Sequence, residues 1–105
     1  MKVDELSGTD LNEAVAKCLG IKHTRYQGQV VDQGGNPLMY DDDWSLAGEI
    51  IEREKIAINY SVKRECWFAE NFLETQAERG ETPLIAAMRC YVASKQGEQD
   101  ANENL

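Results

Sequence analysis

Residues 82–97 constrain the fold more than any other part of this sequence. Thr82 is a residue type that caps helix N-termini, and Pro83 follows it at the first helical position, where the N–H that proline lacks would have no partner. Large apolar residues then recur at the spacing of one helix face: Leu84, Met88, Tyr91 and Val92. We therefore predict a helix that begins at Pro83, packs one face against a core and ends at Gly97.

A second helix is predicted near the start of the chain. Ser7 is a suitable N-cap, and Asp10, three residues later, is a short version of the capping-box partner. The apolar residues that follow keep the spacing of a buried helix face: Leu11, Ala14, Val15, Cys18 and Leu19. Gly20 is expected to end this helix, because glycine tolerates a left-handed backbone.

The middle of the chain predicts short strands and one further helix. Residues 56–60 alternate in the manner of a half-buried strand, and a polar turn leads to a second strand at residues 66–69, so we expect an antiparallel hairpin. Residues 24–31 indicate a short strand, residues 45–55 a short helix, and the polar residues 71–81 no regular element. Short strands with helices before, between and after them predict an α+β sandwich.

A length of 105 residues leaves room for one domain. We place it at residues 1–96, and we predict that residues 97–105 form a disordered acidic tail with almost nothing to bury. The first ten residues lack the apolar centre of a secretory signal. No apolar run approaches the roughly 20 residues that span a bilayer. We therefore expect the chain to act in the cytoplasm.

The net charge is −8, from 19 acidic and 11 basic side chains. This charge argues against direct binding to nucleic acid, whose phosphates require Lys and Arg, and against adhesion to anionic membranes. Two interpretations remain open. The charge serves solubility, or it forms an acidic face that meets a basic partner, such as the nucleic-acid-binding groove of another protein.

The sequence offers no recognisable catalytic or metal-binding set. Cys18, Cys66 and Cys90 are odd in number and have no CxxC spacing, so they predict free, buried thiols instead of disulfides or a zinc site. His23 has no Cys, Ser or carboxylate at a recognised spacing, and we expect it to be exposed to solvent. We therefore expect a protein that is not an enzyme and that carries no metal or cofactor.

Two sets of residues are candidates for binding. Asp41, Asp42 and Asp43 are the densest negative charge, and Trp44 beside them is of a type enriched at interfaces. A solvated loop that also caps a helix is the other interpretation of the three aspartates. As an alternative ligand site, Trp44 and Arg89 together could hold a base and a phosphate. Arg89 could instead extend its charge to solvent.

Two of these stretches resemble the signature regions of the NinX-like family of small phage and prophage proteins of unassigned function. They are residues 40–56 (YDDDWSLAGEIIEREKI) and 82–95 (TPLIAAMRCYVASK), and the opening MKVDELSG is similar too. Many relatives have Gly-Pro where this chain has Gly48-Glu49, so the resemblance does not predict the local turn here. The resemblance implies a small α/β/α-type sandwich with a short, mostly antiparallel sheet and helices packed against it, and it implies no catalytic residues.

The resemblance also implies a phage or prophage origin and action inside the bacterial host. Combined with the acidic charge and the missing catalytic set, it predicts an accessory protein that binds a host protein, and the leading hypothesis is inhibition of a host defence enzyme through an acidic surface. The alternative hypothesis is a small-molecule binder, such as a sponge for a nucleotide signal.

Overall fold

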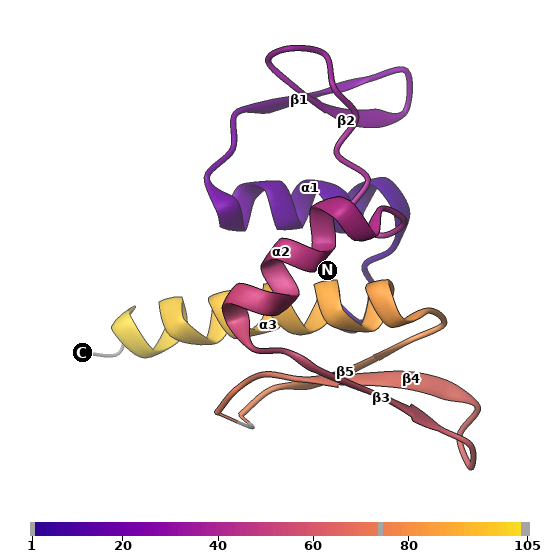
Figure 1. The fold of residues 1–105 in the computed structure, drawn as a ribbon. Helices are drawn as coiled ribbons and strands as arrows, with labels where there is room; N and C mark the ends of the chain where they lie inside the picture. The colour runs from indigo at the N-terminus through magenta and orange to yellow at the C-terminus, as the bar shows by residue number, and fades with distance from the viewer. Residues whose placement is uncertain (1, 74, 104–105) are drawn as a thin grey trace.

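The computed structural model describes residues 2–73 and 75–103, with side chains described as far as Gly97 (Figure 1). The elements follow one another in this order: η1 (Val3–Glu5), α1 (Gly8–Leu19), β1 (His23–Tyr26), β2 (Gln29–Asp32), α2 (Trp44–Glu54), β3 (Ala57–Ser61), β4 (Cys66–Glu70), β5 (Ala77–Gly80) and α3 (Pro83–Glu103). The hairpin β1–β2 and the sheet β3-β4-β5 are both antiparallel.

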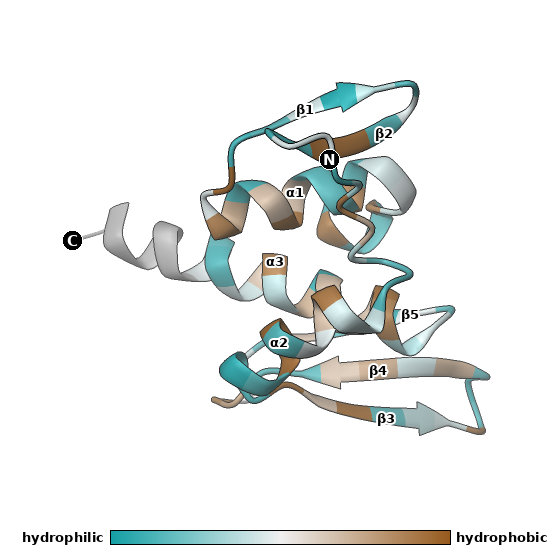
Figure 2. Ribbon diagram, turned by 45° about the horizontal axis from the view of Figure 1, so that its top comes forward, coloured by the Kyte–Doolittle hydropathy of each residue, from teal (hydrophilic) through white to brown (hydrophobic). Residues whose placement is uncertain are grey.

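The helices lie between the two sheets. Helix α3 packs on one face of the three-stranded sheet, α1 packs against α3, and the β1–β2 hairpin covers α1, as Figures 1 and 2 both show. The predicted α+β class is confirmed, with antiparallel strands and helices packed against them. The resemblance implied an α/β/α order of layers, whereas here the helices form the inner layers and strands form the outer ones.

Helix α3 is the centre of the core, as its apolar face predicted. The side chains of Leu84, Met88, Tyr91 and Val92 are all at most 3% exposed. Each fully buried side chain of this kind stabilises the fold by about 1.5–3 kcal/mol. The predicted cap is also confirmed, because the Thr82 hydroxyl oxygen accepts a hydrogen bond of 3.2 Å from the Ile85 N–H.

The predicted end of this helix at Gly97 is wrong, because α3 continues to Glu103. Glycine weakens a helix by only about 1 kcal/mol relative to alanine, and the good helix formers Glu98, Gln99 and Ala101 follow Gly97, so the helix passes through it. Most of the acidic tail that we predicted at residues 97–105 lies outside the described side chains. That it contributes little to packing stays a prediction.

Helix α1 has the predicted bounds but lacks the predicted capping interaction at its start. Gly20 ends it with a left-handed backbone, φ 71°, as expected. Ser7 occupies the N-cap position without any side-chain cap hydrogen bond, so the capping box is wrong. Asp10 instead accepts a hydrogen bond of 2.8 Å from Arg25 of β1. A charge-assisted bond to a guanidinium is stronger than a neutral cap bond, and it orients Asp10 toward the hairpin.

The sequence did not predict two of the strands. The single strand expected within residues 24–31 is the hairpin β1–β2, which turns at Gln27 and Gly28, both with positive φ. Residues 71–81, expected to be irregular, contain β5. Gly80 of β5 lies so close to α3 that an added Cβ would stand 2.5 Å from the Ala86 nitrogen. Strand β5 therefore depends on tertiary packing, and the pattern of apolar residues in the sequence does not predict it.

Candidate functional site

The segment before α2 is anchored to the core by buried side chains and backbone hydrogen bonds. Leu38 and Tyr40 are buried, at 6% and 3% exposure, and the Leu38 N–H donates to the Val30 carbonyl. Met39, between them, accepts backbone hydrogen bonds from Asp42 and Asp43 at 3.1 and 2.8 Å, which closes a turn. The turn is therefore fixed to the core, and it presents the start of α2 to the surface.

The three aspartates have three different environments. Asp43 is the N-cap of α2, and its carboxylate accepts hydrogen bonds from the Ser45 hydroxyl at 2.6 Å and the Ser45 N–H at 2.9 Å. These two bonds hold the pKa of the Asp43 carboxyl below its ordinary value. The prediction that this acidic run supplies a helix cap is confirmed at Asp43.

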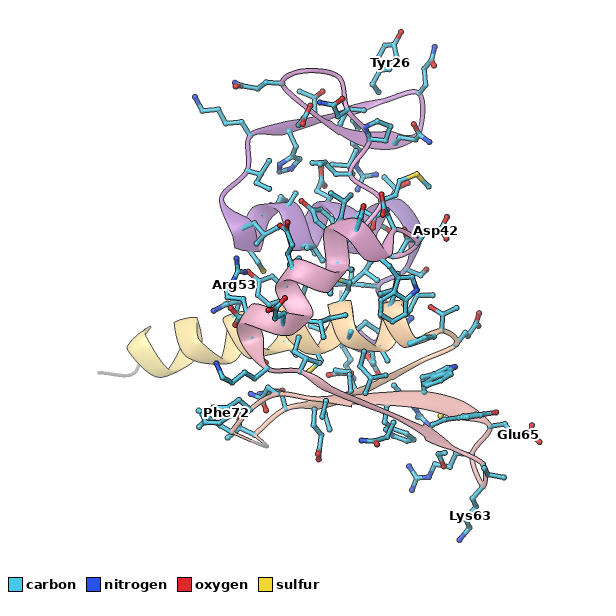
Figure 3. All side chains as sticks on the ribbon, in the orientation of Figure 1. Tyr26, Asp42, Arg53, Lys63, Glu65 and Phe72 are labelled. Atoms are coloured by element: carbon cyan, nitrogen blue, oxygen red, sulfur yellow. The ribbon has the colours of Figure 1, made fainter. Side chains whose placement is uncertain are left out.

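Asp41 faces inward and Asp42 faces outward. The Asp41 N–H donates to the side-chain oxygen of Asn12 at 3.0 Å, and the Asp41 Oδ1 atom is buried without a hydrogen-bond partner in the described part of the chain. Asn12 itself is a buried residue of α1, 7% exposed. Asp42 is exposed, and Figure 3 shows its side chain pointing away from the ribbon beside α2. Of the three aspartates, Asp42 is the most exposed to solvent.

Trp44 is the first residue of α2, and 55% of it is exposed. It borders a shallow hollow of about 440 Å³, and the other residues that line this hollow are Pro37, Met39, Asp42 and Asp43. The sequence indicated the aspartates and Trp44 but not Pro37 or Met39, which reach the site only through the loop after β2. The hollow therefore combines an exposed indole, a thioether and a proline ring with a carboxylate.

Arg89 has neither of the two roles that we considered, which were ligand binding with Trp44 and extension of its charge to solvent. Its Nε donates to the Leu6 carbonyl and its Nη1 to the Arg79 carbonyl, each at 2.8 Å. These bonds join α3 to the segment before α1 and to β5. Arg89 is not among the residues that line the hollow beside Trp44. The structure therefore does not bring the two residues of the alternative ligand site into one hollow.

A polar cluster on α1 and β1 was not anticipated. Arg25 donates to Asp10 at 2.8 Å and to Glu13 at 3.1 Å, and the bond from Arg25 holds the pKa of the Glu13 carboxyl below its ordinary value. His23 lies 3.5 Å from Glu13, and its side chain is 13% exposed. Our expectation of a solvent-exposed His23 is therefore wrong, because the hairpin folds back onto α1.

This cluster joins the hairpin to α1. The Thr9 hydroxyl adds a further hydrogen bond, of 2.7 Å, to the Gly28 carbonyl in the hairpin turn. The contacts that His23 makes are with the Ile21 carbonyl and the Glu13 carboxylate, and neither is a nucleophile that a histidine base would activate. The spacing of Asp10 and Glu13, three residues apart on one helix face, is the sequence signal that could have suggested a basic partner.

The cysteines are free thiols, as predicted, but the expected burial is found only at Cys90, since Cys18 and Cys66 are partly exposed. Cys90 is fully buried in α3, and its burial raises the pKa of the thiol to about 11. Burial also raises the pKa of Cys18. Within residues 2–73 and 75–103, no three His, Cys, Asp or Glu side chains gather in a way that could hold a metal ion. No helix in the same residues is long and apolar enough to cross a membrane.

The family model described as Bacteriophage P22, NinX matches residues 2–95. This match includes the whole of the loop before α2, the hollow beside Trp44 and the buried part of α3. No curated protein matched the chain.

Proposed function

The chain belongs to the NinX family of bacteriophage P22, and from this premise we propose that it is a phage-encoded accessory protein that binds a protein of the bacterial host. Binding takes place at the surface formed by Pro37, Met39, Asp42 and Trp44, which we call the Trp44 surface. The protein acts in the host cytoplasm and has no catalytic activity of its own.

The exposure of Trp44 carries this proposal. A tryptophan is a large apolar side chain that proteins usually cover, and here 55% of it is exposed at a position fixed by the start of α2. Tryptophan is also among the residue types most enriched at the positions that dominate binding energy in protein interfaces. Because Leu38 and Tyr40 anchor the preceding turn, the backbone at Trp44 would lose little conformational freedom when a partner covers the indole.

The neighbours of Trp44 indicate the chemistry of the partner. A Lys or Arg side chain laid over the indole ring would gain a cation–π interaction, and the Asp42 carboxylate stands beside the same hollow to pair with its charge. The net charge of −8 would attract a basic surface over a longer range. A basic groove that normally holds nucleic acid fits both features, and we propose that the protein inhibits a host defence enzyme by occupying such a groove.

The nucleotide-binding alternative has less support. It requires the Arg89 guanidinium at the indole of Trp44, and Arg89 is instead engaged with the carbonyls of Leu6 and Arg79. We therefore develop only the protein-binding proposal.

The proposal can be tested by affinity purification of the tagged protein from host cells, followed by quantitative mass spectrometry. Trp44→Ala should lose the partner, because truncating a central interface tryptophan typically costs about 2 kcal/mol or more, roughly a 30-fold loss of affinity. Tyr26→Ala is the matched control, since Tyr26 is 62% exposed but lies on the hairpin. Equal recovery of the same partner by wild type and Trp44→Ala would refute the proposal.

Kinetics with the purified partner then test the role of charge. Asp42→Asn keeps the size of the side chain and removes its charge, so it should slow association several-fold and reduce the dependence of the association rate on salt. If the association rate and its salt dependence are identical to those of wild type, Asp42 does not contribute to partner binding. This conclusion would hold whatever the result for Trp44→Ala.

A further inference from the structure

A second hollow, of about 310 Å³, lies at the other end of α2 from Trp44. The end of α2 contributes Lys55 and Ile56 to its lining, α3 contributes Tyr91, and the loop after β4 contributes Phe72, which Figure 3 labels. We call it the Lys55 hollow. Among the described residues it shares no lining residue with the hollow beside Trp44, so the two are separate features. Its volume is at the lower end of the range for small-molecule sites.

The Lys55 hollow offers apolar surface to a ligand. Ile56 and Tyr91, which are 7% and 2% exposed, are core residues that also line it. Phe72 and Leu73 line it as well, and they are 68% and 70% exposed. Large apolar side chains that are exposed together beside a hollow are typical of binding sites. An apolar ligand would cover part of both side chains.

Asn71 closes the loop that carries Phe72 and Leu73. Its side-chain oxygen accepts hydrogen bonds from the N–H groups of Thr75 and Gln76, at 2.9 and 3.0 Å. The Asn71 N–H donates to the Gln76 carbonyl at 3.1 Å. The loop is therefore joined at both of its ends, where β4 stops and β5 is about to begin, and it carries the two apolar side chains beside the hollow.

The charged residues of the hollow favour an anion. Arg53 and Lys55 line it, and Glu54 is the one carboxylate among its described lining residues. Glu54 is already engaged, because its oxygens lie 3.1 Å from the Arg53 Nε and 3.2 Å from the Lys95 Nζ. The lining residues therefore carry one positive charge in excess, on a protein whose net charge is −8. A ligand with one negative charge matches this hollow.

Both cations have donors to offer such a ligand. Within the described residues Arg53 donates to Glu54 through its Nε, so the two Nη groups remain for a carboxylate, and the side chain is 56% exposed. Lys55 is exposed and makes no ion pair within the same residues. Its backbone is left-handed, φ 53°, a conformation that glycine adopts more readily. The lysine therefore stands against the local backbone preference, which is typical of functional positions.

We propose that the Lys55 hollow binds an apolar group that ends in a carboxylate. The carboxylate pairs with Arg53 and Lys55, and the apolar body covers Ile56, Phe72 and Leu73. A small fatty acid has this chemistry, and so does the C-terminus of a peptide that ends in an apolar residue. A phosphate group carries about −1.5 to −2 charges at neutral pH, so it fits the single excess positive charge less well. This site is independent of the Trp44 surface and of its protein partner.

Titration of the isotope-labelled chain with octanoate, followed by two-dimensional NMR, tests the site. The amide signals of Ile56, Leu73 and Ser94 should shift along a saturating curve, with a dissociation constant of about 0.1–1 mM for a ligand of this size. Octan-1-ol keeps the apolar chain without the charge and should bind about 10-fold more weakly. Butanoate keeps the charge but lacks four methylene groups, and it should also bind at least about 10-fold more weakly.

Variants separate the site from the fold. Lys55→Gly removes a cation where the backbone suits glycine, so the chain should stay folded and bind octanoate about 10-fold more weakly. Phe72→Ser should weaken octanoate several-fold. The matched controls are Lys63→Gln and Val62→Ser, which change exposed residues in the turn between β3 and β4, at the opposite end of these strands from Phe72 (Figure 3). Both controls should bind octanoate as wild type does, and so should Trp44→Ala.

A short peptide distinguishes the two sources of the carboxylate. Acetyl-Gly-Gly-Leu with a free carboxylate should bind more tightly than octanoate if the site takes a peptide terminus, and more weakly if it takes a small acid. Either result supports the proposed chemistry. The proposal would be overturned if Leu73 and Ser94 show no saturable shifts with up to about 5 mM octanoate. Equal affinities for octanoate and octan-1-ol would also overturn it, as would a Lys55→Gly chain that binds octanoate as tightly as wild type.

Discussion

Arg89 donates a hydrogen bond of 2.8 Å to the carbonyl of Leu6, a residue 83 positions earlier in the chain. The same guanidinium donates to Arg79 in β5, so one side chain of α3 fastens both the start of the chain and the last strand. Leu6 is buried at 8% exposure, and its carbonyl is part of the path from η1 into α1. Arg89 is therefore a structural residue of this fold.

Replacing Arg89 by Ala should destabilise the protein by about 2–3 kcal/mol, because two carbonyls lose a charged donor. Arg89→Lys should be intermediate, since an ammonium group cannot span the two acceptors as a planar guanidinium does. Urea denaturation measures both effects. If Arg89→Ala unfolds at the same urea concentration as wild type, these two bonds contribute nothing to stability.

The contrast between Thr82 and Ser7 gives a second prediction. Both residues precede a helix, but the Thr82 hydroxyl accepts from the Ile85 N–H, whereas Ser7 makes no side-chain cap bond. Thr82→Ala should therefore cost about 1 kcal/mol, and Ser7→Ala should change stability by only a few tenths. Chemical denaturation of the two variants in parallel measures the difference. Equal losses would mean that cap geometry does not decide the stability of these helix starts.

The buried thiol gives a third prediction. Cys90 is fully buried and its thiol pKa is about 11, so it should be inert to a thiol reagent at about pH 8 in the native protein. Cys66, which is half-buried at the hairpin end of β4, should react faster. The rates can be assigned by mass spectrometry of labelled peptides. Labelling of Cys90 should increase only when urea unfolds the domain, and fast labelling in buffer would show that α3 opens readily.

The elements that sequence predicts best here are those whose determinants are local. The bounds of α1 and the start of α3 follow from apolar periodicity, and they are framed by Gly20, Thr82 and Pro83. Strand β5 has no apolar periodicity, because Glu78 and Arg79 occupy its centre. Gly80 is required because a larger residue would collide with α3. The existence of β5 depends on pairing with β4, which no short window of sequence contains.

The candidate site divides in the same way. The cap formed by Asp43 could be predicted, because Ser45 lies two residues away. The different environments of Asp41 and Asp42 could not, since Asp41 is oriented by Asn12, which is 29 positions earlier. Pro37 and Met39 join Trp44 only because the loop after β2 is bridged at Val31↔Pro37 and closes against α2.

The last prediction concerns the pH dependence of the Asp43 cap. Because the bonds from Ser45 hold the pKa of the folded carboxyl below its ordinary value, the ionised form is the one that stabilises α2. This contribution should be fully present above the pKa of the unfolded chain, about 3.9, and it should be lost as the pH falls through the lower pKa of the folded state. In Asp43→Asn the side chain still caps the helix but does not titrate.

The stability difference between wild type and Asp43→Asn should therefore be constant from about pH 7 to about pH 5 and should shrink below about pH 4. All other acidic groups titrate in both proteins, so their effects cancel in the difference. Asp42→Asn is the control for removing one negative charge beside the same helix start, because Asp43, not Asp42, is the N-cap of α2. Urea midpoints measured at each pH give both curves. A difference between wild type and Asp43→Asn that grows as the pH falls would mean that the neutral carboxyl is the better cap, which contradicts the bonds to Ser45.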